Sequence, residues 1–105
     1  MNSKIKSILR DSINTKESIL KDKEIMASIK NIVDVCFKTI SNNGCIFFCG
    51  NGGSAADAQH LAAELTGKFK TDRKPLKGIV LGSNLSSITV IGNDYSFADV
   101  FSREL

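Results

Sequence analysis

The sequence predicts an α/β domain built on a parallel β-sheet and preceded by helices. Two short apolar runs, residues 45–49 and 78–82, have the length and composition of strands. One helical pattern lies between them, and another fills residues 1–43. Because a strand–helix–strand order brings the second strand back in the direction of the first, it indicates a parallel pair. We therefore expect a helical segment over residues 1–43 and an α/β domain over residues 44–105.

The composition is that of a soluble globular protein. Of the 105 residues, 42% are hydrophobic and 24% are charged, so one small domain with a single core is expected. The net charge of +3 is too small, and too dispersed, to indicate a nucleic-acid partner. There is no apolar run that would cross a bilayer and no signal peptide, so we expect a cytoplasmic protein with no membrane partner. An odd number of cysteines without zinc-finger spacing predicts free, buried thiols at Cys36, Cys45 and Cys49.

The helical segment contains two amphipathic patterns. The stronger one runs from Ile25 to Ile40 with an i, i+3, i+4 spacing, which predicts a long helix centred on Ile32. The sequence NNG at residues 42–44 predicts its end. The earlier helix has a weaker apolar stripe, formed by Ile5, Ile8, Leu9 and Ile13. Because a chain this small has little core to cover that stripe, we expect it to pack on a partner subunit.

The first apolar run, residues 45–49, is typical of a strand that is buried on both faces. The pattern after it predicts a helix over residues 55–66 that ends at Gly67. Residues 68–77 contain several lysines and the only proline, which indicates a basic loop leading to the second strand.

After the second apolar run, residues 78–82, the sequence predicts a short helix over residues 85–91. Ser96, followed three residues later by Asp99, resembles a capping box and predicts the start of a last amphipathic helix.

The turn after the first strand contains three glycines, Gly50, Gly52 and Gly53, and is followed by Ser54. Glycines let backbone amides approach a ligand closely, and the first N–H groups of the next helix attract negative charge. An anion or a sugar hydroxyl suits this place, with Asn51 and Ser54 as further donors. The alternative is a tight turn without a ligand.

A dinucleotide is a second possible ligand, because residues 50–55 also satisfy the pattern G-x-G-x-x-A. That fingerprint requires an acidic residue at the end of the second strand to hold the ribose. Ser83 and Asn84 follow the strand instead, which argues against a dinucleotide.

The helix after the turn carries polar residues on one side. At 100° per residue, Asp57, His60 and Glu64 share a narrow sector. His60 and Glu64 stand at i, i+4, where two side chains can share a metal ion or a proton; the alternative is a solvated surface pair. The adjoining sector is apolar and is expected to face the sheet; it contains Ala58, Leu61, Ala62 and Leu65.

The segments CGNGGSAADAQHLAAELTGKFK and IGNDYSFADVFSREL resemble the sedoheptulose-7-phosphate (phosphoheptose) isomerase family of the SIS, or sugar isomerase, superfamily. The GNGGS turn, the D-x-x-H-x-x-x-E helix and the GND segment occur together at that family's spacing. The resemblance implies a flavodoxin-like parallel sheet with helices on both faces, and a homotetramer. It also implies conversion of sedoheptulose 7-phosphate to D-glycero-D-manno-heptose 7-phosphate, for bacterial lipopolysaccharide or capsule heptose.

The resemblance also implies roles for particular residues. Glu64 matches the base that moves a proton between C1 and C2, and His60 and Glu64 match two zinc ligands. The expected substrate contacts are Asn51, Gly52, Gly53, Ser54, Glu64, Asn93 and Asp94.

The resemblance covers the N-terminal half of the family's chain. The later half carries a Ser/Thr-rich phosphate loop, a glutamine and a histidine that have no counterpart here, so we expect these 105 residues alone to be inactive and to bind zinc weakly. Two alternatives exist in the superfamily: replication-initiator-associating proteins, which bind a partner protein, and a module that senses a phosphosugar without turnover. The former share the glycine turn and the Gln-His pair, here Gln59 and His60, but lack the glutamate that follows, so Glu64 favours the enzyme.

Overall fold

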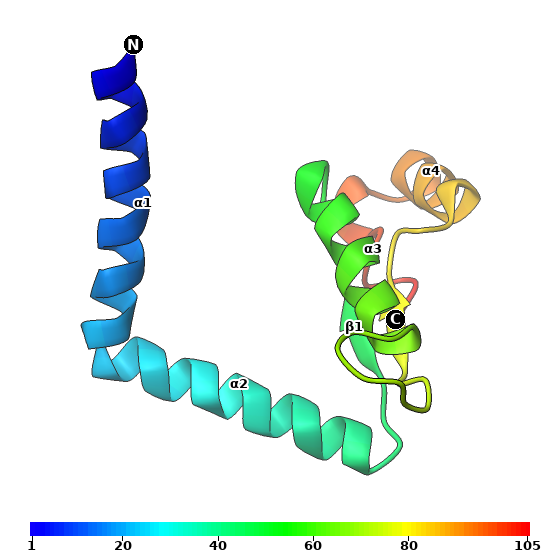
Figure 1. Cartoon of the computed structure of the whole chain (residues 1–105). Coiled ribbons are helices and arrows are strands. Elements are labelled where there is room, and N and C mark those ends of the chain that lie inside the picture. The colour runs from blue at the N-terminus through cyan, green and yellow to red at the C-terminus, as the bar shows by residue number, and fades with distance from the viewer. The chain divides into compact units, whose positions relative to one another are not determined.

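The computed structural model describes residues 1–105, which form two units, Met1–Phe37 and Lys38–Leu105. The predicted α/β class is confirmed. In chain order the elements are α1 (Asn2–Lys21), α2 (Lys23–Ser41), β1 (Ile46–Phe48), α3 (Gly53–Thr66), β2 (Gly78–Val80), α4 (Leu85–Asp94) and the 3₁₀ helix η1 (Phe97–Asp99) (Figure 1). No helix among them combines the length and the apolarity that a membrane crossing requires.

Asp22 separates the two N-terminal helices. Its backbone is extended, with φ −86° and ψ 107°, which ends α1. Its side-chain oxygen accepts hydrogen bonds from the N–H groups of Glu24 at 2.9 Å and Ile25 at 3.0 Å, so the same residue caps the start of α2. Neither helix has a buried residue, and the stripe of α1 is exposed, Ile8 by 60%.

The predicted end of α2 is confirmed. Asn43 has a left-handed backbone with φ 58°, which asparagine tolerates better than most residues, and the Gly44 N–H donates to the Thr39 carbonyl at 2.7 Å. Lys77 holds the segment that leads from α2 to β1, since its Nζ donates to the Asn43 carbonyl at 3.0 Å. The Lys77 carbonyl in turn accepts from the N–H of Ile46, the first residue of β1.

The two strands form a parallel pair, as the sequence predicts. Ile46 pairs with Gly78, and Phe48 pairs with Val80. Helix α3 packs on one face of this pair (Figure 1). The approach is close because α3 presents Ala58 and Ala62, both buried, and a Cβ on Gly78 would lie within 3.0 Å of the Leu65 side chain.

The apolar strands predict a sheet that is covered on both faces, and within residues 1–105 one face is covered while the other is open. Phe47 and Ile79, which are register partners, are 45% and 49% exposed. They point away from α3, the one helix that packs against β1 and β2.

Leu61 was expected to face the sheet but is 51% exposed, because the short contact surface of α3 is occupied by its alanines. All three cysteines are free, as predicted, but none is buried: Cys36 and Cys45 are half-buried, and Cys49, which lies beyond the last residue of β1, is exposed.

The C-terminal part differs from the prediction in two places. Helix α4 continues beyond residue 91 to Asp94. The predicted last helix is instead the short η1 followed by turns: Ser96 Oγ does accept from the Ala98 N–H at 3.1 Å, but no bond returns from the Asp99 side chain to complete the box. The tight turn buries Val100, which is 1% exposed, as η1 packs against α4.

Candidate functional site

The three glycines of the turn between β1 and α3 serve different purposes. A Cβ on Gly50 would lie 2.6 Å from the Cβ and backbone of Ser54, so the fold itself requires glycine there. Gly52 caps α3 with a positive φ of 56°, a conformation that favours glycine. At Gly53 neither requirement applies: its φ is not positive, and no atom lies within 4 Å of where its Cβ would stand. Its bare backbone leaves open space beside the start of the helix.

The backbone of the turn has unused hydrogen-bond donors. The N–H of Ser54 donates to the Asn51 carbonyl at 3.0 Å, and that of Ala55 to the Gly52 carbonyl at 3.1 Å. The N–H groups of Asn51, Gly52 and Gly53 have no acceptor within the chain. Three successive free N–H groups at the positive end of a 14-residue helix provide a place for an anion or for hydroxyl oxygens. Asn51 and Ser54 are exposed beside them.

His60 and Glu64 lie one turn apart on α3, as the sequence predicts. Their side chains meet, with His60 Nε2 3.1 Å from Glu64 Oε1. The His60 side chain is 73% exposed and that of Glu64 is 36% exposed, so the pair faces outward and solvent reaches both groups. Asp57 is exposed and forms no ion pair with His60. A carboxylate held beside an imidazole can accept a proton from a bound molecule or share a metal ion.

The pair fits one half of a zinc site. Imidazole nitrogen and carboxylate oxygen bind zinc at roughly 2.0–2.2 Å, which places two ligand atoms of a tetrahedron about 3.3–3.6 Å apart. The 3.1 Å between Nε2 and Oε1 is close to that separation. No group of three or more histidine, cysteine or acidic side chains gathers anywhere in residues 1–105, so this chain offers two ligands at this place.

Asn93 and Asp94 lie apart from these residues. They are the last two residues of α4, both are exposed, and Asn93 Nδ2 donates to Asp94 Oδ1 at 2.9 Å. Helix α4 packs against η1 and makes no contact with α3. The structure therefore brings the turn, His60 and Glu64 together on one helix, and places Asn93 and Asp94 on another.

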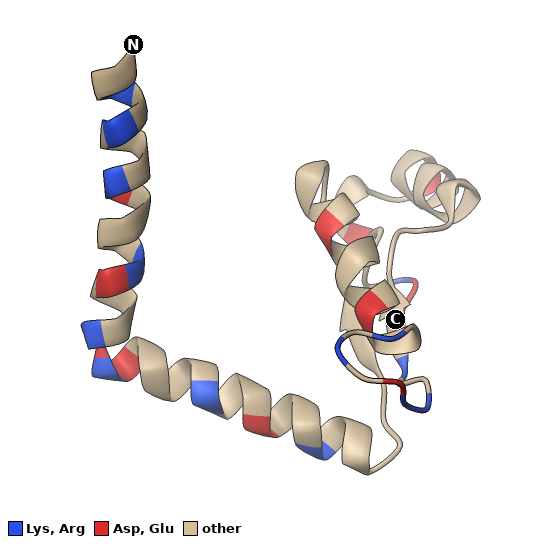
Figure 2. Cartoon of the chain, in the orientation of Figure 1, with Lys and Arg blue, Asp and Glu red and all other residues tan.

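One contact near Glu64 was missed by the sequence reasoning. Arg73, in the loop after α3, donates from Nη2 to the Glu64 carbonyl at 2.7 Å and from Nη1 to the Leu65 carbonyl at 2.9 Å. Figure 2 shows the basic residues of this loop beside the end of α3. The available signal was an arginine within ten residues of a predicted helix end, because cations favour the negative end of a helix.

Comparison with known families gives one match over most of the chain. The model of the SIS domain family matches residues 9–105.

Two relatives illustrate the sequence similarity. A phosphoheptose isomerase of Clostridium acetobutylicum is 44% identical over 105 residues, which is 100% of this chain and 54% of the relative. A phosphoheptose isomerase of Helicobacter hepaticus is 54% identical over 78 residues, 74% of this chain and 40% of the relative. The chain spans about half the length of the curated relatives it matches.

Solved structures agree with the sequence comparison. The phosphoheptose isomerase of Neisseria gonorrhoeae superposes with a TM-score of 0.83 at 36% identity, covering 98% of this chain and 52% of that one. The enzyme of Francisella tularensis gives a TM-score of 0.77 at 31% identity, covering 97% and 52%.

Proposed function

Because this chain belongs to the SIS domain family, we propose that it carries part of the active site of a phosphoheptose isomerase. The reaction is the interconversion of sedoheptulose 7-phosphate and D-glycero-D-manno-heptose 7-phosphate. The observation that carries the proposal is the arrangement on α3: free amides at its first turn, and a carboxylate paired with the single histidine on its outer face. The relatives named as phosphoheptose isomerases, aligned over the whole chain, support it.

In this proposal the glycine turn binds the sugar. The free N–H groups of Asn51, Gly52 and Gly53 donate to oxygens of the substrate, and the open space at Gly53 lets the sugar approach the backbone. Ser54 and Asn51 add side-chain donors. Asn93 and Asp94, at the end of α4, complete the substrate contacts that this chain contributes.

Glu64 is the proposed base. An aldose–ketose isomerisation removes a proton from the carbon beside the carbonyl and returns it to the neighbouring carbon, so one carboxylate beside C1 and C2 can perform both steps. The negative charge that develops on the two oxygens needs fixed donors nearby. The exposed carboxylate of Glu64 is accessible to a bound sugar, and His60 orients it.

His60 and Glu64 are also the residues of this chain that would hold a zinc ion. When bound, such an ion would stabilise negative charge on the substrate oxygens. As a zinc ligand, Glu64 would be held in place beside His60, which it already contacts.

We further propose that the protein is a homotetramer and works in the cytoplasm. The exposed apolar stripes of α1 and α2 support self-association. A phosphorylated sugar does not cross a membrane unaided, which supports a reaction on the side where the sugar is made. The product would supply heptose for bacterial lipopolysaccharide or capsule.

The test is an assay of the full-length protein with sedoheptulose 7-phosphate, with and without added zinc, following the aldose product chromatographically. We expect turnover, retention of zinc after gel filtration, and loss of that zinc in His60→Gln. Binding of the sugar phosphate without turnover would contradict the proposal and favour a sensing module. If there is neither binding nor turnover, a protein-binding role like that of the replication-initiator-associating proteins would be favoured instead.

A further inference from the structure

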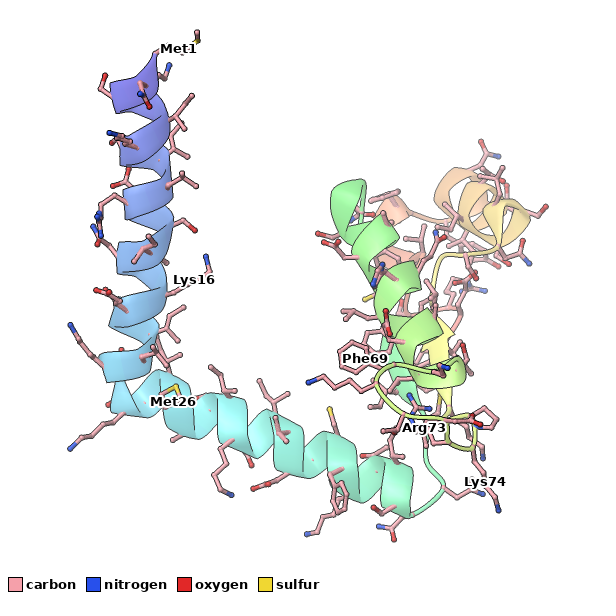
Figure 3. The ribbon with its side chains drawn as sticks, in the orientation of Figure 1. Met1, Lys16, Met26, Phe69, Arg73 and Lys74 are labelled. Carbon is pink, nitrogen blue, oxygen red and sulfur yellow. The ribbon has the colours of Figure 1, made fainter.

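Arg73 forms hydrogen bonds with the last turn of α3, one of them at Glu64, the residue proposed as the base. Its guanidinium donates from Nη2 to the carbonyl oxygen of Glu64 at 2.7 Å and from Nη1 to that of Leu65 at 2.9 Å. The arginine is half-buried, and Figure 3 shows it in the loop below the end of α3. The two bonds connect residues eight and nine positions apart, so they close the loop back onto the helix.

These carbonyls are among the groups that a helix end leaves unpaired. The Ala63 carbonyl accepts from the Gly67 N–H at 2.8 Å, and the Leu65 carbonyl also accepts from the Leu76 N–H at 3.0 Å. The Glu64 carbonyl has Arg73 as its one donor in the chain. The guanidinium therefore supplies the donor that the backbone does not, at the residue proposed as the base.

We propose that Arg73 is a positioning residue for Glu64. Its hydrogen bonds to the carbonyls of Glu64 and Leu65 fix the backbone of Glu64, and thereby the position of the carboxylate beside the substrate. This inference rests on the proposed isomerase function. A guanidinium presents its donors in one rigid plane, so gripping two carbonyls restrains both the position and the rotation of the last turn. Catalysis is sensitive to such restraint, because small displacements of a catalytic group lower the rate more than they lower binding.

Three variants of the full-length protein test the role of the Arg73 hydrogen bonds. Arg73→Gln removes the charge and the fork, Arg73→Lys keeps the charge but reaches one carbonyl at a time, and Lys74→Gln removes an equal charge from the exposed neighbouring residue. We expect kcat to fall about 10- to 100-fold in both Arg73 variants, with KM changed less than about twofold, and to stay unchanged in Lys74→Gln. Wild-type turnover in Arg73→Lys would show that charge alone suffices and would overturn the inference. An equal loss in Lys74→Gln would overturn it as well.

A second measurement does not depend on activity. The ring signals of His60 in metal-free, ¹⁵N-histidine-labelled protein, assigned by their loss in His60→Gln, report the imidazole that contacts Glu64. We expect them to shift in both Arg73 variants and to keep their wild-type position in Lys74→Gln. If the wild type shows no turnover, the proposed function fails, while shifted His60 signals would still support the grip on Glu64. Unshifted signals in both Arg73 variants would overturn the inference, whatever the activity.

Discussion

Gly50 and Ser54 approach so closely that a single added methyl group on Gly50 would stand 2.6 Å from the Cβ of Ser54. This contact folds the end of β1 directly against the first turn of α3. Asn51, Gly52 and Gly53 lie between these two residues in the chain. The contact therefore brings the free N–H groups of all three together at the start of α3.

We therefore predict that Gly50→Ala destabilises the protein. The backbone of Ser54 must move to admit the methyl group, and overpacking of this kind costs about 1–3 kcal/mol of unfolding free energy. Thermal unfolding followed by circular dichroism should show a midpoint lowered by about 4–8 °C per kcal/mol lost. An unchanged midpoint would mean that the turn has room that the structure does not show.

Gly53→Ala, three residues later, should do the opposite. No atom lies within 4 Å of the new methyl group and no positive φ is required, so stability should hold or rise by up to about 1 kcal/mol, the helix preference of alanine over glycine. The methyl group would instead occupy the space proposed for the sugar. We expect weaker binding of sedoheptulose 7-phosphate by calorimetry, with the fold intact. Normal affinity would remove Gly53 from the substrate site.

Glu64→Gln should abolish isomerase turnover in the full-length protein and leave folding and sugar binding nearly unchanged. The amide cannot take up the proton, whereas the exposed His60–Glu64 pair contributes only about 0–1 kcal/mol to stability. The measurements are kcat, substrate affinity and the unfolding midpoint. Asp72→Asn, which makes the same chemical change at an exposed loop position, is the control and should behave as wild type. Substantial turnover in Glu64→Gln would exclude Glu64 as the base.

The part of this site that the sequence predicted depends on local chemistry. Glycine turns, caps and i, i+4 spacing act within a few residues, so the GNGGS turn, the end of α3 at Gly67 and the His60–Glu64 contact were all predicted correctly. The stop of α2 at residues 42–44 was predictable for the same reason.

The features that the sequence did not predict depend on tertiary packing, that is, on which parts of the chain lie against one another. The apolar composition of β1 and β2 predicted two covered faces, but whether Phe47 is covered depends on a packing partner rather than on its neighbours in the chain. Leu61 has the correct helical phase and is still exposed. An arginine soon after a helix end favours a contact with the last carbonyls, but this tendency does not specify that Arg73 returns across nine residues to Glu64.

The N-cap of α4 offers a stability test away from the turn. Asn84 Oδ1 accepts from the N–H groups of Ser86 at 3.0 Å and Ser87 at 3.2 Å, so Asn84→Ala leaves both donors without a partner. We expect a loss of about 1 kcal/mol, measured by urea unfolding, and little loss in Asn84→Asp, which keeps an acceptor oxygen. Equal losses in the two variants would show that the cap is not what Asn84 contributes.

The last prediction concerns self-association through the N-terminal helices. The stripe of α1 exposes Ile5 by 52%, Ile8 by 60% and Leu9 by 59%. Burying three such side chains gains about 1.5–3 kcal/mol each, which does not clearly exceed the estimated cost of about 4–15 kcal/mol for joining two molecules. The exposed stripe of α2 must therefore join the interface if the assembly is to be stable at micromolar concentration.

Two matched variants test this interface. Ile8→Lys places a charge in the stripe and should shift the mass measured by light scattering towards the monomer, because a charge is costly to bury without a partner. Ser7→Lys adds the same charge one position away, off the stripe, and should leave the assembly intact. A wild-type protein that is monomeric at micromolar concentration would contradict the prediction. Equal effects of the two lysines would indicate that net charge, rather than the stripe, controls association.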